Sequence, residues 1–258
     1  MPTVTSTLPL AVQLYTLRNL PDPLDTVLGQ VAAAGYRGVE TVGDHGMTAE
    51  ALRDLLAKHN LQAVSAHVGL PKLEGDFDGV AAFNRTIGNL TLVIPALPQD
   101  MRPTDAEGWR QIGRRLEELA QRAFNAGLHL LYHNHAWEME PMEGKTALDW
   151  LLEAAPHLGW EPDLAWIVRG AADPLPLLER YTGRCARIHV KDLAPAGQGE
   201  AEKGFADVGY GTLDWATLLP AAKAAGGEWF IVEHDWPQDA IRTIQRSHDF
   251  LQGLLATQ

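Results

Sequence analysis

The chain of 258 residues is predicted to fold as a single (β/α)8 TIM barrel, in which eight parallel strands form a cylinder surrounded by helices. Its length matches the roughly 250 residues that one such barrel requires. Apolar segments of strand length alternate with helical patterns, and this alternation favours parallel strands that are buried on both faces. No GxGxxG motif follows the first apolar segment, which argues against an open dinucleotide-binding sheet. One domain covering residues 1–258 is therefore expected.

One unit recurs along the chain: a helix, a glycine that ends it, an apolar strand and a polar cluster. The first helix is expected to begin near Pro23, since proline suits the first helical turn, and to end at Gly35. The same order of features recurs around Gly127 and Gly226. Eight strands are predicted at residues 8–17, 36–42, 61–67, 90–94, 128–132, 158–164, 185–191 and 229–232.

Two further segments have recognisable boundaries. Thr104 and Glu107 form a capping box that predicts the start of a long helix. The apolar face of this helix is expected to carry Ile112, Leu116, Leu119 and Ala123. Residues 194–211 are predicted to form a long loop after the seventh strand, and long loops in compact domains are usually functional or mobile.

Composition excludes several classes of protein. The formal net charge of −12, with only 21 Lys and Arg, opposes binding to nucleic acid. No run approaches the ~20 apolar residues of a membrane span, and residues 1–8 lack the basic start of a secretory signal, so a cytoplasmic protein without a membrane partner is expected. Cys185 is the only cysteine, which excludes an internal disulfide and a multi-thiolate zinc site. This cysteine is expected to be buried and unreactive.

Polar side chains gather where the predicted strands end. The residues concerned are His67, His133, His135, Asp163, His189, Lys191 and Glu233. The strand ends of a barrel converge on one face, and clustered histidines and carboxylates would repel or desolvate one another unless a cation organised them. One divalent metal is therefore expected, and the mixed nitrogen and oxygen donors suit Mn2+, Co2+, Zn2+ or Mg2+. Glu40, on the second strand, is either a pocket residue or an ion-pair partner at the rim.

Five motifs carry a family resemblance that extends, in order, along the chain. They are QLYTLR (13–18), YHNHAWE (132–138), EPDLAW (161–166), IHVKD (188–192) and VEHD (232–235). Together they resemble the xylose-isomerase-like sugar phosphate isomerase/epimerase family. The resemblance implies a barrel with one or more divalent metals and an activity that isomerises, epimerises or dehydrates sugars or cyclitols. It is specific for the fold and the metal site and weak for the substrate.

The resemblance also implies roles for individual residues. The family's metal ligands fall on Glu138, Asp163, His189 and Glu233, and His133 competes with Glu138 for the position on the fifth strand. Glu233 and Glu138 are the candidate bases. By the same analogy, His67 and Lys191 would hold substrate oxygens, and the predicted pocket residues are Gln13, His133, His135, Trp166 and Trp236. Many relatives have histidine at the position of Trp166, which leaves the reaction open.

The expected function is metal-dependent isomerisation or epimerisation of a sugar or keto-sugar, by removal of a proton beside a carbonyl through a stabilised enediolate. Two alternatives stay open: a dehydratase of a keto-cyclitol such as inosose or of a dehydroshikimate-like acid, and a non-catalytic sugar-binding barrel. No Gly-rich loop or Arg pair suited to phosphate is visible, which favours an unphosphorylated substrate. Exposed loop aromatics are compatible with a homodimer.

Overall fold

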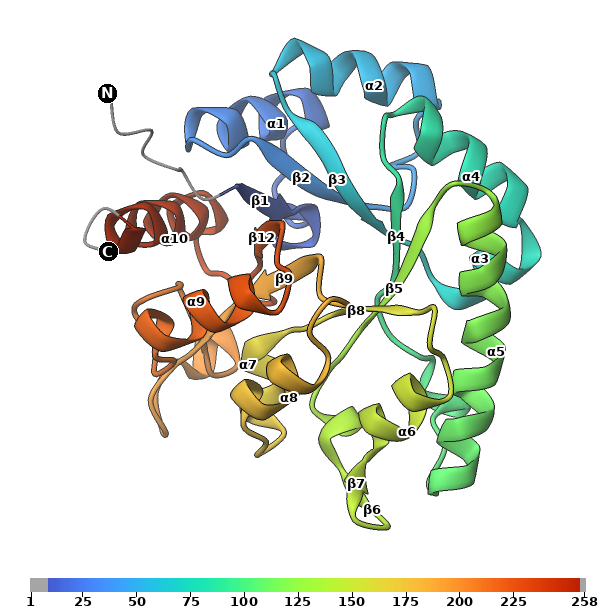
Figure 1. Ribbon diagram of the computed structural model, residues 1–258. Coiled ribbons are helices and arrows are strands. Elements are labelled where there is room, and N and C mark those ends of the chain that lie inside the picture. Colours follow the sequence, from blue (N-terminus) through green and yellow to red (C-terminus); the bar gives the residue numbers. More distant parts are fainter. Residues whose placement is uncertain (1–8, 256–258) are drawn as a thin grey trace, which may run out of the picture.

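A computed structural model gives the structure of the chain and describes residues 9–255 (Figure 1). Eight parallel strands form one sheet that curls into a barrel. The strands are β1 (Leu10–Gln13), β2 (Gly38–Val42), β3 (Gln62–His67), β4 (Thr91–Ile94), β5 (His129–His133), β8 (Gly159–Glu161), β9 (Arg187–Val190) and β12 (Trp229–Val232). Their order is β8-β5-β4-β3-β2-β1-β12-β9, so each strand lies beside its neighbour in sequence except where the first strand pairs with the last. The predicted fold class is confirmed.

Two seams complete the cylinder. At the first, β1 pairs with β12 in parallel, with Val12 opposite Val232. At the second, β8 and β9 are the two ends of the strand order, and a single parallel bridge between Asp163 and His189 links them. The backbone N–H of His189 also donates to the carbonyl of Pro162 over 2.9 Å. The barrel is therefore nearly closed, and its second seam lies among the predicted site residues.

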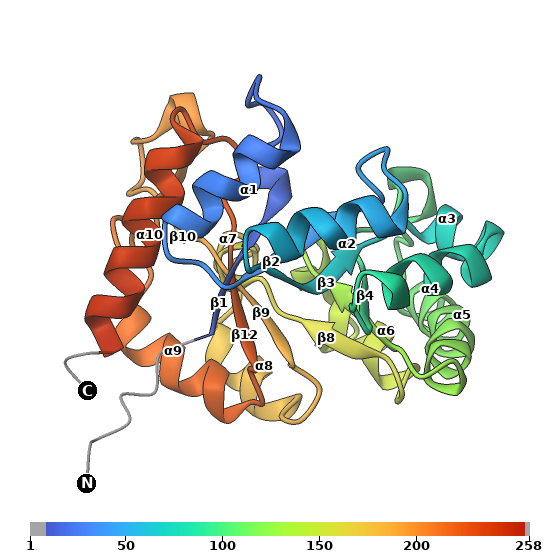
Figure 2. The same ribbon diagram turned by 90° about the horizontal axis from the view of Figure 1, so that it is seen from above.

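Helices surround the barrel, as the two ribbon views show (Figures 1 and 2). They are α1 (Leu24–Ala33), α2 (Ala49–Lys58), α3 (Leu70–Gly75), α4 (Phe77–Thr86), α5 (Ala106–Asn125), α6 (Ala147–Glu153), α7 (Leu164–Arg169), α8 (Pro174–Arg180), α9 (Trp215–Ala224) and α10 (Ala240–Leu255). Most strands are followed by a helix that buries one apolar face against the sheet, the arrangement that parallel strands require.

Helix α5 shows both a confirmed prediction and a wrong one. Its predicted apolar face is buried, including Leu116 and Ala123. The N-cap, however, is Asp105 and not Thr104: the Asp105 carboxylate accepts a hydrogen bond from the backbone N–H of Gly108 over 2.7 Å. Both residue types are good caps, and the backbone selects the aspartate, which has the extended conformation of a capping residue.

The predicted strand ends are less accurate than the strands themselves. Of the first predicted strand, residues 10–13 form β1, residues 14–17 form a 3-10 helix, and residue 8 lies outside the described residues. The sixth predicted strand, residues 158–164, is shortened to β8, because Asp163 already caps helix α7. The glycines that end the preceding helices were predicted correctly. Gly35, Gly127 and Gly226 have φ of +98°, +70° and +111°.

The segment after β9 is more ordered than a simple loop. Short strands β10 (Asp192–Leu193) and β11 (Phe205–Ala206) pair in antiparallel fashion within it, and a 3-10 turn (Glu200–Glu202) lies between them. Phe205 is buried and its ring packs edge-on against Trp166, with ring centroids 5.3 Å apart. A second small hairpin, β6 (Pro141–Met142) with β7 (Lys145–Thr146), precedes α6. Both hairpins belong to loops that follow barrel strands.

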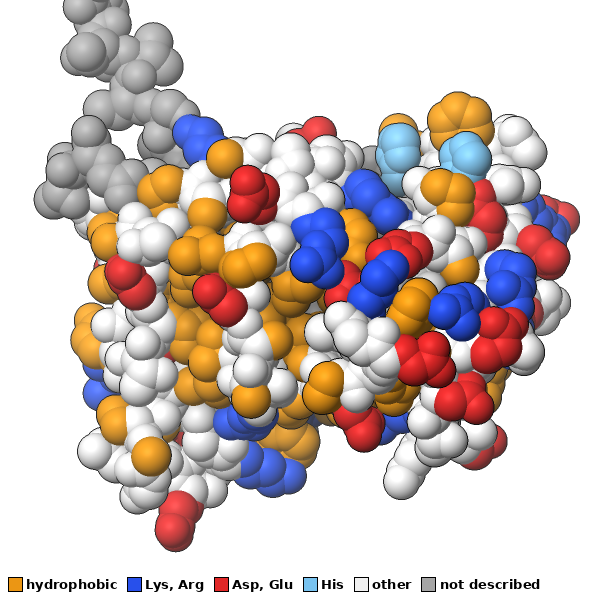
Figure 3. Space-filling view, turned by 60° about the horizontal axis from the view of Figure 1, so that its bottom comes forward, with side chains coloured by type: hydrophobic (Ala, Val, Ile, Leu, Met, Phe, Trp, Pro, Cys, Tyr) orange, Lys and Arg blue, Asp and Glu red, His pale blue; other side chains and the backbone are white. Residues whose placement is uncertain are grey.

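Surface charge is distributed as small groups of opposite sign. Figure 3 shows a face on which basic and acidic side chains are interspersed. Ion pairs such as Arg114–Glu107 (2.6 Å) and Arg122–Asp78 (2.9 Å) join exposed partners, and pairs of this kind contribute little to stability. Within residues 9–255, no helix is both long and apolar enough to cross a bilayer.

Candidate metal centre

A pocket of about 640 Å3 opens at the carboxyl ends of the barrel strands. Its walls include five histidine and carboxylate side chains from three different strand ends: His67, His133, His135, Glu233 and Asp235. The strand ends thus converge on one face, as the sequence predicted. Aromatic side chains complete the walls, with Tyr15 and Trp236 beyond the adjacent strands β1 and β12 and Trp137 and Trp166 beyond the adjacent strands β5 and β8. Aromatic faces of this kind suit the apolar face of a sugar ring.

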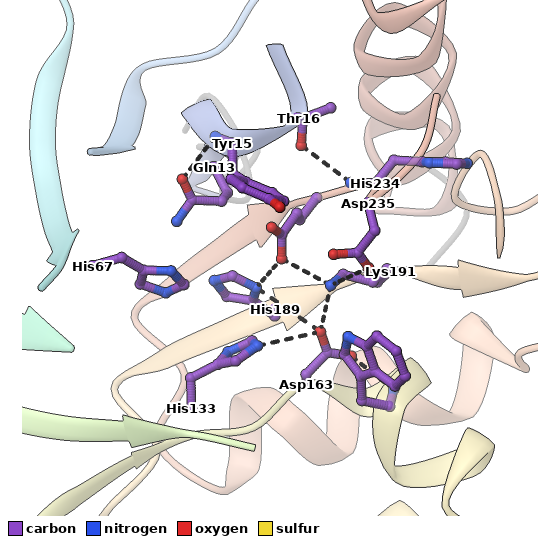
Figure 4. A network of polar contacts seen from close by, with 12 residues as sticks. Gln13, Tyr15, Thr16, His67, His133, Asp163, His189, Lys191, His234 and Asp235 are labelled. Atoms are coloured by element: carbon purple, nitrogen blue, oxygen red, sulfur yellow. Dashed lines mark hydrogen bonds and ion pairs between the residues drawn. The ribbon is translucent and has the colours of Figure 1, made fainter. Parts of the chain in front are cut away.

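Four buried side chains, here called the metal group, lie together at the base of this pocket. They are His133, Asp163, His189 and Glu233, and one donor atom of each lies within 4.8 Å of the others. His189 Nδ1 is 3.0 Å from Glu233 Oε2 and 4.0 Å from Asp163 Oδ2, and His133 Nε2 is 3.7 Å from Asp163 Oδ2. Figure 4 shows the rings of His133 and His189 directed toward Asp163.

Backbone geometry places these four side chains. His133 is the last residue of β5, Asp163 follows β8, His189 lies within β9 and Glu233 follows β12. Side chains alternate between the two faces of a strand, and these four point into the barrel. Asp163 has a second role, since its Oδ1 accepts the backbone N–H of Trp166 and so caps helix α7. That contact fixes the carboxylate and leaves Oδ2 to face the group.

Lys191 lies against the carboxylates of the metal group. Its Nζ is 2.9 Å from Asp163 Oδ2, 2.8 Å from Glu233 Oε2 and 2.9 Å from Asp235 Oδ2. Burial opposes the charge on Lys191, but the three carboxylates raise its pKa well above the usual range. Burial also raises the pKa of Glu233, yet Lys191 and the hydrogen bond to His189 outweigh it and lower that pKa. Lys191 is 1% exposed and is not among the described pocket walls.

Two fully buried glutamates, here called the glutamate layer, lie next to the metal group. Glu40 Oε1 is 2.7 Å from His189 Nε2 and 3.0 Å from His67 Nε2, and Glu161 Oε2 is 2.9 Å from His67 Nε2. Burial lowers the pKa of His67, but the two glutamates outweigh it and raise this pKa to about 9. Glu40 is neither on the pocket wall nor at the rim: it is fully buried and pairs with His67 and His189 inside the barrel.

Glu161 received no role from the sequence, although it was part of a quoted motif. A signal was present, since Glu161 lies two residues before Asp163 and alternate strand residues share a face.

Glu138 is a correction to the predicted ligand set and to the predicted pair of bases. One of its carboxylate oxygens accepts from the Tyr132 hydroxyl over 2.6 Å, and the other accepts from the backbone N–H of His135 over 2.7 Å. The residue belongs to a 3-10 turn (Trp137–Met139) after β5, and neither cluster of potential ligands among the described residues includes it. Burial raises its pKa to about 7. His133, the other candidate on the fifth strand, belongs to both clusters.

The remaining predicted residues divide into pocket walls and support. His67, His135, Trp166 and Trp236 line the pocket. Burial lowers the pKa of His135 to about 3, which keeps the ring neutral. Gln13 is not a pocket residue: it is fully buried, and its Nε2 donates to Glu40 Oε1 over 2.6 Å. Gln13 lies opposite Glu40 on the adjacent strand, so its amide pairs with that carboxylate inside the barrel and does not reach the pocket.

The donor set of the metal group fits a divalent cation. Two imidazoles and two carboxylates are a mixed nitrogen and oxygen set, and the described residues offer no cysteine there. Burial raises the pKa of Asp163 even though Lys191 opposes this, so the positive charge that the side chains supply is incomplete. His133 Nδ1 and Glu161 Oε1 are also buried without a hydrogen-bond partner. A doubly charged ion would balance the buried carboxylates.

Comparison with known proteins identifies the family of the barrel. A family model described as the xylose isomerase-like TIM barrel matches residues 28–254. The chain belongs to this family. The rhizopine catabolism protein MocC of Rhizobium meliloti is 27% identical to this xylose isomerase-like barrel over 245 residues, which are 82% of this chain and 74% of MocC. Inosose dehydratase of Lacticaseibacillus casei is 23% identical over 244 residues, covering 81% of each chain.

Solved structures show the same fold at lower identity. A sugar phosphate isomerase/epimerase from Parabacteroides distasonis superposes with a TM-score of 0.81 at 19% identity, covering 97% of this chain and 95% of its own. The IolI protein, solved with a zinc atom bound, superposes with a TM-score of 0.76 at 17% identity, covering 97% of this chain and 99% of its own. At such identities the likeness shows the barrel and leaves the reaction open.

Proposed function

We propose that the chain is a divalent-metal-dependent isomerase or epimerase that removes the proton beside the carbonyl of a keto-sugar or keto-cyclitol. The observation that carries this proposal is the metal group, His133, Asp163, His189 and Glu233, at the base of the pocket. Support for the substrate class comes from the family and from the aromatic walls. Lys72 is the one Lys or Arg among the described pocket walls, which favours a substrate without phosphate.

The chemistry divides between the metal and the side chains. A bound divalent cation supplies positive charge that stabilises negative charge on the substrate oxygens as the proton leaves. Glu233 accepts the proton at a carboxylate oxygen, and its lowered pKa keeps it deprotonated and ready at neutral pH. The protonated Glu233 then returns the proton to the substrate, while His135, neutral and on the pocket wall beyond β5, can hydrogen-bond to a substrate oxygen. Lys191 holds the carboxylates of Glu233 and Asp163 in place.

A two-stage experiment tests this proposal. Metal content is measured on the purified protein, and ketoses, 3-keto-sugars and inososes are then screened by proton NMR for exchange of the α-proton with deuterated solvent. We expect one Mn2+, Co2+, Zn2+ or Mg2+ per chain and exchange that chelation abolishes. Bound metal with no exchange for any sugar would instead support a non-catalytic sugar-binding barrel.

A matched pair of variants isolates the metal group. His133→Ala removes a ligand at the end of β5, whereas His129→Ala changes an exposed histidine at the start of the same strand. The first variant is expected to lose metal and exchange activity, and the second to keep both. Equal metal content in the two variants would contradict the assignment of His133.

Dehydration is the second candidate, and the inosose dehydratase relative favours it. It begins with the same proton removal, after which a hydroxyl leaves from the neighbouring carbon as water. A second group must then donate a proton to the departing oxygen, and His67 and His135 are the pocket histidines outside the metal group. Proton NMR of the products separates the two reactions: the dehydrated keto-cyclitol has lost water and, once its enol ketonises, gives a new methylene signal, whereas an isomerase product keeps all its hydroxyl-bearing carbons.

A further inference from the structure

We propose that Glu40 and Glu161, the glutamate layer, are positioning residues that fix which ring nitrogen of His133 and His189 faces the metal group. This inference rests on the proposed metal-dependent function and adds two residues to it. Metal-binding histidines commonly donate their second ring N–H to a carboxylate, which orients the ring and strengthens it as a ligand. Both histidines of the metal group have such a carboxylate on their far side.

The imidazole of His189 lies between the two sets of carboxylates. Its Nδ1 faces the metal group, 3.0 Å from Glu233 Oε2. Its Nε2 faces the glutamate layer, 2.7 Å from Glu40 Oε1 and 3.2 Å from Glu161 Oε2. A proton held at Nε2 by Glu40 leaves the lone pair of Nδ1 directed at the metal group. The ring is completely buried.

His133 is arranged in the same way with its two nitrogens exchanged. Its Nε2 faces Asp163 Oδ2 at 3.7 Å, and its Nδ1 is 3.2 Å from Glu161 Oε2. His133 Nδ1 makes no hydrogen bond in the structure, but a proton there, on the side of Glu161, would leave the lone pair of Nε2 for the metal. The two histidines therefore use opposite ring nitrogens as ligands, Nδ1 in His189 and Nε2 in His133.

The glutamate layer and its histidines could also bind a metal, so a second cation site is the alternative explanation for this cluster. His67, His133, Glu161 and His189 do form a second cluster whose donor atoms lie within 4.8 Å of one another. In that cluster, however, Glu161 Oε2 lies close to all three histidines. It is 2.9 Å from His67 Nε2, 3.2 Å from His133 Nδ1 and 3.2 Å from His189 Nε2.

The ring nitrogens of His67 and His189 hydrogen-bond to Glu161 and Glu40, so the layer's carboxylates already have N–H donors without a cation. Glu40 Oε1 is surrounded similarly, by Gln13 Nε2 at 2.6 Å, His189 Nε2 at 2.7 Å and His67 Nε2 at 3.0 Å. The geometry is that of carboxylate acceptors among N–H donors. His67 and Gln13 anchor the two glutamates, and the histidines of the metal group are held in turn.

Metal affinity and cobalt spectroscopy of three variants test this inference. Glu40→Gln and Glu161→Gln keep the shape of each side chain and remove its charge. Asp149→Asn is the matched control, because Asp149 is also a buried carboxylate, hydrogen-bonded to Tyr181 and Arg180 well outside the pocket. For each protein the metal stoichiometry, the dissociation constant, the visible spectrum of the Co2+ form and the unfolding midpoint of the metal-free form are measured.

We expect one metal per chain throughout, a dissociation constant raised about 10- to 100-fold in each glutamate variant, and an altered Co2+ spectrum. Asp149→Asn is expected to lower the unfolding midpoint and leave affinity and spectrum unchanged. Unchanged affinity and spectrum in Glu161→Gln and Glu40→Gln would overturn the positioning role while leaving the proposed function intact. Two metals in the unmodified chain and one in Glu161→Gln would show a cation site in the layer, which also overturns it. An unmodified chain that binds no metal would remove the proposed function itself.

Discussion

Buried charge is neutralised differently at the two ends of the barrel, and strand β9 runs from one end to the other. At its start, Arg187 donates from Nε to the carbonyl of Val64 over 2.8 Å and from the guanidinium to Thr91 and the exposed Glu228. Two and four residues later, His189 and Lys191 lie among carboxylates that exceed the positive charge beside them. At the amino end of the strands, the Arg187 guanidinium has its hydrogen-bond partners within the protein. At the carboxyl end, the buried carboxylates have less positive charge beside them, and a bound cation would balance it. Stability is expected to depend on the first and function on the second.

The largest predicted effect is at the pocket end. Glu233→Gln removes the proposed base and one carboxylate of the metal group, so we expect α-proton exchange to fall by at least about 1,000-fold. Solvent deuterium uptake followed by NMR measures the loss, and circular dichroism with an unfolding curve checks that the fold remains. Exchange within about tenfold of the unmodified chain would show that another group is the base.

At the opposite end, Arg187→Ala is expected to destabilise the fold by about 2–4 kcal/mol, because it leaves the buried carbonyl of Val64 without a donor and opens a space inside the barrel. Denaturant unfolding measures this change. Metal stoichiometry in the folded fraction is expected to stay at one per chain. If the variant lost metal at unchanged stability, the division of roles between the two ends would be wrong.

Glu138 gives a smaller, pH-dependent effect. Burial raises its folded-state pKa to about 7, above the unfolded value near 4.5, so the folded state binds the extra proton. Its contribution to stability is therefore greatest below the unfolded pKa and is lost as pH rises through about 7. We expect the unmodified chain to lose on the order of 1–3 kcal/mol more than Glu138→Gln between pH 5 and pH 8. Parallel pH profiles of the two proteins would contradict a buried, proton-binding Glu138.

The smallest effect concerns Cys185, just before β9. Its thiol is fully buried, and burial raises its pKa to about 12. Thiol reagents at pH 8 are expected to leave the folded protein unlabelled and to modify one group after denaturation. Rapid labelling of the native protein would mean that this end of the barrel opens readily.

The fold followed from the sequence more fully than the site did. Glycine-terminated helices and apolar strands repeat at regular intervals, and each of the eight strands lies within or next to its predicted range. Strand ends were harder because Asp163 both follows a strand and caps a helix, which shortens β8.

At the site, the structure brings Asp163, His189 and Glu233 together because each lies at or near the carboxyl end of a strand and faces inward. Glu138 was misplaced because five residues beyond His133 the chain has turned, and the alternation of a strand no longer indicates direction. The contacts of Gln13, Lys191 and Glu161 depend on pairs separated by more than 25 residues, as with Gln13 and Glu40. Such pairs leave no local pattern in one sequence.

Because a single bridge between Asp163 and His189 closes the barrel, a bound metal would affect the stability of that closure. These two residues hold the sparsest junction of the sheet, and they are also neighbours in the metal group. An ion bound by both residues would cross-link β8 and β9 at that junction. Because the unfolded chain has no preformed metal site, metal binding would stabilise the folded state by RT ln(1 + [metal]/Kd). This is about 2.7 kcal/mol when the metal concentration is one hundred times Kd. Removal of the ion would then favour local opening of the sheet between β8 and β9 before the other strand pairs separate.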